Sequence, residues 1–227
     1  MDANQLSGKR IGLWVGGALV LTAVIIGAFL LAGAKPGEAP ESNPVASLPP
    51  VSESDWVIGS ATSTNVLIEY SDFQCPACAS YFPLVEQVVK EYSGEIKFVY
   101  RHFPLAQHPY APSASAASEA AGMQGKFWEM YRILFENQTE WVAAADESAA
   151  KKLFAVYAAR LGLNATQFSS DIEKAEVADK VMEQYRGGVA AEVNATPTFF
   201  MNGYKLQNPT GLASFKQQID EIIAKSN

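Results

Sequence analysis

Apolar residues change their spacing several times along the chain, and each change marks the boundary of a predicted element. The run VLIEY, residues 66–70, is apolar and contains β-branched residues, which predicts a strand covered on both faces. Directly after it, apolar residues recur every three or four positions as far as Tyr92, which predicts an amphipathic helix beginning near Pro76. A second strand, IKFVY at residues 96–100, follows. This order predicts a right-handed βαβ unit with parallel strands.

The second half of the chain has a different pattern. Residues 109–191 are rich in alanine and carry charges at helical spacing, which predicts a block of helices, the first of them over residues 113–135. PTFFMNGYKL, residues 197–206, predicts a hairpin that turns at Asn202-Gly203, and residues 212–225 predict a closing helix. With residues 109–191 set aside, the order is βαβ–ββα. We therefore predict an α/β thioredoxin fold with an inserted helical domain.

The N-terminal region has the pattern of a membrane segment. Residues 11–34 contain no charged side chain, and about 20 apolar residues are enough to cross a bilayer. Lys9 and Arg10 predict that residues 1–10 are cytoplasmic and that the chain beyond Ala34 is extracytoplasmic. The predicted location is the inner membrane, with a single transmembrane signal-anchor. Cleavage after Ala34 of a signal peptide, giving a secreted form, is the alternative.

Residues 35–54 are rich in proline, serine and glutamate, which predicts a flexible linker before a folded domain at residues 55–225. The formal net charge is −7. A surface that binds nucleic acid or anionic lipid needs clustered lysine and arginine, so this charge argues against either partner.

The only two cysteines, Cys75 and Cys78, stand three positions apart at the start of the first helix. A structural disulfide between them would close a very short loop and would stabilise the fold by about 2 kcal/mol. This is a small gain from the only two cysteines of the chain. As half of a zinc site they would need His102 and His108, but twenty-three residues separate Cys78 from His102, more than the roughly 12–15 of zinc fingers. We therefore predict no metal site and favour the third explanation, a reversible dithiol.

The predicted position of each sulfur fits disulfide exchange. At the start of a helix, free N–H groups and the dipole stabilise a thiolate, so we expect a lowered pKa for Cys75. Cys78 lies one turn further in, at the head of the apolar stripe. An exposed Cys75 would attack a client, and a buried Cys78 would resolve the mixed disulfide. Disulfides persist outside the cytoplasm, where such an exchanger has substrates.

Several separated motifs together resemble the DsbA-like thiol-disulfide oxidoreductases, in the membrane-anchored or secreted bacterial branch. They are EYSDFQCPACASYFP, YRHFPL followed by His108, QGKFWEMYRILFENQ and NATPTFFMNG, in this order over about residues 55–225. The resemblance implies that Cys75 is the nucleophile and Cys78 the resolving thiol. It also implies that Thr196-Pro197 contains a cis peptide bond beside the cysteines, where an extended client segment binds.

The resemblance implies tuning residues as well. Glu69 would be a buried acid with a raised pKa that exchanges protons with Cys78, whereas an acid at a partly exposed strand end is the alternative. Pro76 and Ala77, between the cysteines, would set the redox properties. The strongest oxidants of the family have histidine where this chain has Ala77, so we expect a milder oxidant.

The predicted function is dithiol oxidation of extracytoplasmic proteins through a Cys75–Cys78 disulfide, without a further cofactor. Reduced or disulfide-bonded protein clients and a membrane redox protein for reoxidation are the expected partners. A disulfide reductase or isomerase of the same fold is one alternative. A non-catalytic, membrane-tethered binding module is another.

Overall fold

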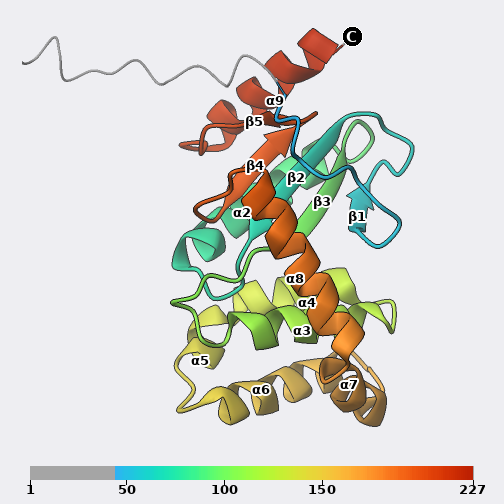
Figure 1. The fold of residues 1–227 in the computed structure, drawn as a ribbon, viewed down its shortest axis with the longest axis vertical. Helices are drawn as coiled ribbons and strands as arrows, with labels where there is room; N and C mark the ends of the chain where they lie inside the picture. Colours follow the sequence, from blue (N-terminus) through green and yellow to red (C-terminus); the bar gives the residue numbers. More distant parts are fainter. Residues whose placement is uncertain (1–43, 227) are drawn as a thin grey trace, which may run out of the picture. The chain divides into compact units, whose positions relative to one another are not determined.

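The computed structural model describes residues 44–226, and in this part of the chain a five-stranded mixed sheet is flanked by helices (Figure 1). The strand order is β1-β3-β2-β4-β5. β2 and β3 are parallel, as the βαβ prediction requires, and the other neighbouring pairs are antiparallel. The strands are β1 (Trp56–Gly59), β2 (Val66–Ser71), β3 (Lys97–His102), β4 (Thr198–Met201) and β5 (Tyr204–Lys205). The edge strand β1 was not predicted from the sequence.

Two helices belong to the thioredoxin part and the others to the insertion. α2 (Pro76–Glu91) follows β2, and α9 (Leu212–Ser226) closes the chain. The insertion contains α3 (Ala111–Gly122), α4 (Phe127–Glu136), α5 (Gln138–Val142), α6 (Glu147–Arg160), α7 (Ala165–Ile172) and α8 (Ala175–Ala190). In Figure 1, α3 to α7 lie beyond one end of the sheet, and α8 runs back from them across its face.

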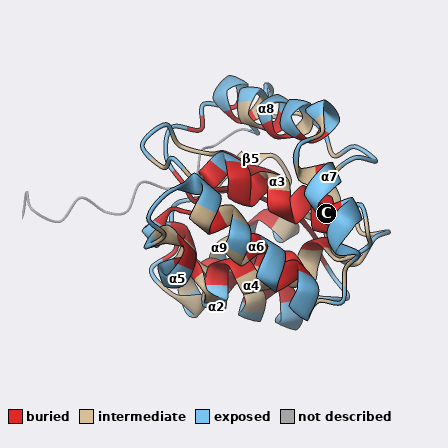
Figure 2. Cartoon of the chain, turned by 90° about the horizontal axis from the view of Figure 1, so that it is seen from below, coloured by how far each residue is buried: buried red, intermediate tan, exposed pale blue. Residues whose placement is uncertain are grey.

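The insertion is built around α3. Almost all of this helix is buried, whereas α6, α7 and α8 have exposed outer faces (Figure 2). Its alanines and serines allow the surrounding helices to approach closely. The single helix predicted over residues 113–135 is in fact α3 and α4, because the chain turns at Gly125, whose positive φ of 75° suits glycine.

The two faces of the sheet are covered differently. On one face, Leu67 and Phe98 join a large core with α2, α9 and the insertion. On the other face, a smaller core of Ile68, Tyr70 and Phe200 packs against Tyr185 of α8. Alternate residues of β2 therefore point into different cores, which explains why apolar residues occur on both faces of the strand.

An N-terminal strap, residues 44–55, completes the second face. Its partly buried apolar residues, Val45, Leu48 and Val51, pack against the smaller core. The Arg101 guanidinium donates hydrogen bonds to the carbonyl oxygens of Pro49 and Pro50, each at 2.8 Å, and forms an ion pair with Asp55 at 2.9 Å. The flexible linker predicted for residues 35–54 is thus wrong over its described part, because this part gains buried partners.

The predicted cytoplasmic segment 1–10 and transmembrane segment 11–34 lie outside the described residues. Within residues 44–226, no helix combines the length and hydropathy needed to cross a bilayer.

Candidate active site

The two cysteines lie at the N-terminus of α2. Cys75 is the N-cap residue, with an extended backbone, and Pro76 occupies the first turn, where a missing N–H costs nothing. Both cysteines are free thiols in this structure, with Cys78 1% exposed and Cys75 6% exposed. The exposed Cys75 expected from the sequence is therefore largely covered, although its neighbours Pro76 and Ala77 are exposed.

The pKa values of the two thiols are shifted in opposite directions. A hydrogen bond from the Cys78 thiol lowers the pKa of Cys75 from 9.0 to about 5, against the effect of burial, and the backbone N–H groups of Cys78 and Ala77 act in the same direction. Burial raises the pKa of Cys78 well above 9.0, and the nearby Cys75 and Glu69 raise it further. The site thus holds one thiolate and one thiol at neutral pH.

The turn before the cysteines is fixed by side chains from distant segments. Asp72 accepts hydrogen bonds from Gln74 N at 2.7 Å, from Leu105 N at 2.8 Å and from His108 Nδ1 at 2.7 Å. Gln138, the first residue of α5, donates from Nε2 to the carbonyl oxygens of Phe73 at 2.7 Å and Cys75 at 3.0 Å. The helical insertion therefore holds the backbone of the cysteine turn directly.

Thr196 and Pro197 lie beside Cys75, and the peptide bond between them is cis, as the resemblance implies. In its protonated form, Cys75 donates from Sγ to the Thr196 carbonyl oxygen at 3.6 Å. The buried Thr196 hydroxyl has no partner among the described residues and also lowers the pKa of Cys75. The antiparallel β2–β4 pair explains this contact, since it brings the segment before β4 next to the end of β2.

Glu69 lies in β2 on the face that carries Cys78. It is 1% exposed, and burial raises its pKa from 4.5 to about 7, while the nearby Ser71 hydroxyl opposes the shift. Ser71 also favours the thiolate of Cys78, although its Oγ forms no hydrogen bond of ordinary geometry. The buried position that we predicted for Glu69 is the one observed.

Several residues of the site could not be identified from the sequence. Asp72 and Gln138 hydrogen-bond to backbone atoms far along the chain, at Leu105 for Asp72 and in the cysteine turn for Gln138, and the sequence does not show these contacts. The two histidines have carboxylate partners: His102 Nε2 is 2.9 Å from Glu119, and His108 Nδ1 is 2.7 Å from Asp72. In residues 44–226 no group of three or more metal-ligating side chains is suited to hold an ion.

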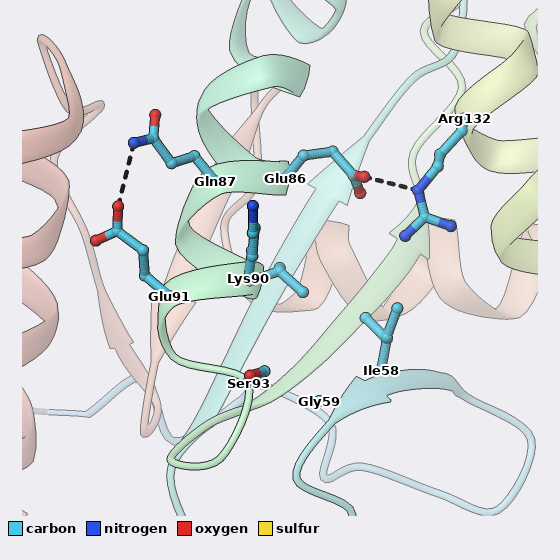
Figure 3. Close-up of a pocket in the computed structure, with 9 residues that line it drawn as sticks. Ile58, Gly59, Glu86, Gln87, Lys90, Glu91, Ser93 and Arg132 are labelled. Atoms are coloured by element: carbon cyan, nitrogen blue, oxygen red, sulfur yellow. Dashed lines mark hydrogen bonds and ion pairs between the residues drawn. The ribbon is translucent and has the colours of Figure 1, made fainter.

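A separate pocket of about 710 Å³ lies along α2, away from the cysteine turn (Figure 3). Its charged lining is largely paired: Glu86 accepts from Arg132 Nε at 2.6 Å, and Glu91 accepts from Gln87 at 3.1 Å. Neither cysteine lines it. The candidate chemistry is therefore at the N-terminus of α2 and not in this pocket.

Comparison with known proteins gives a family and a fold. The family model described as Thioredoxin matches residues 51–221. The crystal structure of alpha-DsbA1 from Wolbachia pipientis superposes with a TM-score of 0.70 at 21% identity, covering 81% of this chain and 97% of that one. Oxidised BdbD from Bacillus subtilis gives 0.64 at 21% identity, covering 73% and 90%. The predicted fold with a helical insertion is thereby confirmed.

The curated relatives carry a different name. Na(+)/H(+) antiporter NhaA 1 from Mycolicibacterium vanbaalenii is 35% identical over 169 residues, which are 73% of this chain and 26% of that protein. The protein of the same name from Salinispora arenicola is 36% identical over 171 residues, 75% of this chain and 25% of that protein. The chain thus spans about a quarter of the length of these relatives.

Proposed function

Because the chain belongs to the thioredoxin family and has the fold of DsbA-type proteins, we propose that it exchanges disulfides with protein clients through Cys75 and Cys78. The predicted resemblance to DsbA-like proteins is confirmed. The observation that carries the proposed activity is the asymmetry of the thiols, with the pKa of Cys75 at about 5 and that of Cys78 well above 9.0. Exchange needs a stable thiolate beside a protonated, sheltered partner.

The proposed reaction consists of two successive thiol-disulfide exchanges. A client thiolate attacks Cys75 Sγ of the Cys75–Cys78 disulfide, the S–S bond breaks, and Cys78 leaves as a thiolate. Cys78 then takes a proton from Glu69, since its own pKa is far higher. A second client thiolate attacks the client sulfur of the mixed disulfide, and Cys75 leaves as a stable thiolate. The client loses two electrons, and the cysteine pair gains them.

Thr196 and Pro197 are proposed to bind the client. The Thr196 carbonyl lies at hydrogen-bond distance from Cys75, so an extended client segment that pairs with this backbone would bring its cysteine to the sulfur. Pro76 and Ala77 are proposed to tune the couple. Ala77 offers neither charge nor a side-chain hydrogen bond, so the thiolate depends on Cys78, Thr196 and the helix N-terminus.

Oxidation is the proposed direction, because a stable Cys75 thiolate favours the reduced enzyme and makes the disulfide an oxidant. Reduction or isomerisation by the same couple is the second candidate. We propose an extracytoplasmic domain held by residues 11–34 and reoxidised by a membrane redox protein, with no cofactor beyond the disulfide itself. The antiporter name belongs to relatives in which the shared segment is about a quarter of the protein, and we do not extend it to this chain.

The test is refolding of a reduced, unfolded client by the oxidised protein. We expect stoichiometric client disulfides with the wild-type protein and none with Cys75→Ser. With a client that already contains a disulfide, the Cys75 thiolate of Cys78→Ser should attack one client sulfur, displace the other as a thiolate and remain in a mixed disulfide, because no second thiol resolves it. A redox titration with glutathione then fixes the direction, with an expected potential below that of the strongest oxidants of this fold. Oxidation of the client by Cys75→Ser at the wild-type rate would contradict the proposal.

A further inference from the structure

A group of buried polar atoms without hydrogen-bond partners lies next to the resolving cysteine. Within residues 44–226, seven buried side-chain atoms lack a partner, and five of them belong to side chains on one face of β2 and β3 or on α4 above it. The five are Glu69 Oε2, Ser71 Oγ, Tyr100 OH, His102 Nδ1 and Tyr131 OH. Buried polar atoms are almost always hydrogen-bonded to protein or to ordered water, so a cluster of this kind indicates internal hydration.

The register of the sheet places these groups side by side. In the parallel β2–β3 pair, Glu69 is opposite Tyr100 and Ser71 is opposite His102. The ring of Tyr100 lies 5.3 Å from that of His102 and 5.2 Å from that of Tyr131, measured between centroids. Cys78 is close to this layer, because the charges of Glu69 and Cys78 both raise the pKa of Tyr100, and the charge of Glu69 raises the pKa of Cys78.

From His102 a continuous set of contacts leads to the surface. His102 Nε2 is 2.9 Å from Glu119 Oε1, and the other oxygen of Glu119 accepts from Lys180 Nζ at 2.7 Å and from Trp56 Nε1 at 2.9 Å. The His102 and Glu119 side chains are 1% and 4% exposed, but that of Lys180 is 19% exposed. Trp56, Glu119 and Lys180 line a surface pocket of about 350 Å³ between α3 and α8.

We propose that Tyr100, His102, Glu119 and Lys180, with water bound between Glu69 and His102, conduct protons between the Cys78–Glu69 pair and the pocket between α3 and α8. This inference rests on the proposed exchange at Cys75 and Cys78. It assigns proton-transfer roles to residues outside the cysteine turn, and it gives the insertion a part in the chemistry.

Proton balance supplies the reason for such a route. Each time Cys78 leaves a disulfide it removes one proton from Glu69, and Glu69 must then be reprotonated. At that moment a client covers the Cys75 end of the site. One proton entering from solvent at Lys180 and Glu119 and passing through His102 and Tyr100 to Glu69 restores the starting state.

The chemistry of the groups suits this task. Burial raises the pKa of Tyr100 and Tyr131 well above 10.0, so both remain O–H groups that donate and accept hydrogen bonds. Burial opposes ionisation of Glu119, but His102 and Lys180 outweigh it and keep its pKa below 4.5. The ionisable side chains that face this route are Glu69 of β2, Cys78 of α2, Glu119 of α3, Tyr131 of α4, Lys180 of α8, and Glu53, Asp55 and Glu176 at the pocket.

The experiment measures protonation of Glu69 directly, without turnover. Cys75 is alkylated to cover the client side, and the carboxyl band of Glu69, identified by its loss in Glu69→Gln, is followed by infrared spectroscopy after a rapid pH jump. We expect Glu119→Gln and Lys180→Met to slow the relaxation, and His102→Ala to slow it by about tenfold or more. Added imidazole should restore the rate of His102→Ala, because it replaces the missing ring.

Matched controls separate proton transfer from packing. Glu140→Gln removes a carboxylate that accepts from Tyr157, and Lys151→Met removes a lysine paired with Glu173, both within the insertion but off the route. Wild-type relaxation rates in all three route variants, or a slow His102→Ala that imidazole does not restore, would overturn the inference. If His102→Ala does not fold, Glu119→Gln is compared with Glu140→Gln. The inference then requires a slower relaxation in Glu119→Gln than in Glu140→Gln, and equal rates would overturn it. Failure of the client assay, by contrast, would contradict the proposed function alone.

Discussion

Gln138 Nε2 donates a hydrogen bond to the carbonyl oxygen of Cys75 at 3.0 Å, although the two residues are 63 positions apart in the chain. The same nitrogen donates to Phe73 at 2.7 Å, and the side chain is buried. One side-chain amide of the insertion thus bridges two carbonyl oxygens of the turn that ends at Cys75. The geometry of Cys75 therefore depends on the insertion as well as on α2.

Replacing Gln138 with methionine should keep the volume and remove both hydrogen bonds. Because buried carbonyl oxygens are left without this donor, we expect a loss of about 1–3 kcal/mol in the free energy of unfolding and slower exchange with a client. Urea unfolding and single-turnover client oxidation measure the two effects. Gln217→Met is the control, since that amide bonds only Glu221 at an exposed site. Equal behaviour of the two variants would show that the Gln138 contacts are dispensable.

The thiolate of Cys75 should depend on Cys78. The hydrogen bond from Cys78 is the largest cause of the lowered pKa, so Cys78→Ala should move the pKa of Cys75 upward from about 5. Thiolate absorbance and the rate of alkylation, both followed against pH in the reduced protein, give the midpoint. The opposite change, Ala77→His, adds a donor beside the sulfur and should move the midpoint down. An unchanged midpoint in Cys78→Ala would place the stabilisation elsewhere.

Local sequence patterns were sufficient for most of the fold. Short apolar runs identified β2 and β3, the Asn202-Gly203 turn between two such runs identified the β4–β5 hairpin, and amphipathic helical patterns identified α2 and α9. β1 was missed because it is only four residues long, Trp56–Gly59, and its one partner, β3, is distant in sequence. The strap was predicted to be flexible because its apolar residues are few, and it is held by Arg101, whose position no local pattern reveals.

The cysteine pair could be predicted because its signal is local in the sequence. The residues that surround the pair in the structure could not be predicted in this way. The spacing of Cys75 and Cys78 at the start of a helix is a local signal with a clear chemical meaning. Gln138 and the His102–Glu119 pair meet only after the sheet and the insertion have packed. His102 appeared in the sequence as an unlikely zinc ligand, and nothing nearby in the chain indicated its carboxylate partner.

Arg101 should be the main attachment of the strap to the sheet. In Arg101→Met the buried Asp55 loses its ion pair and the carbonyl oxygens of Pro49 and Pro50 lose their donor. Breaking a buried pair on one side costs about 3–5 kcal/mol, so we expect a large drop in stability and faster proteolysis within residues 44–55. Arg160→Met, at an exposed arginine over the Tyr157 ring, is the control. If both variants are cleaved at the wild-type rate, Arg101 is not the main attachment of the strap to the sheet.

Glu69 should make stability depend on pH in a defined window. Its pKa is about 7 in the folded protein against 4.5 ordinarily, so between these values the folded state keeps a proton that the unfolded chain releases. The free energy of unfolding therefore falls as pH rises through the window, by about 1.4 kcal/mol per pH unit and about 3 kcal/mol in all. Below pH 4.5 both states are protonated, and above about pH 7 both are ionised, so the effect is constant there.

Glu69→Gln removes this titration while keeping the shape of the side chain. We expect the stability of the variant relative to wild type to increase between pH 4.5 and about 7 and then to level off. Urea unfolding of the oxidised proteins at several pH values measures this, because the disulfide prevents the thiols from titrating. Glu95→Gln, at an exposed position, is the control. The oxidised variant should also react more slowly with reduced clients, since the departing Cys78 thiolate has lost its proton donor. A pH-independent difference between Glu69→Gln and wild type would mean that Glu69 ionises as an ordinary surface acid, and the proton-transfer role proposed for it would then be wrong.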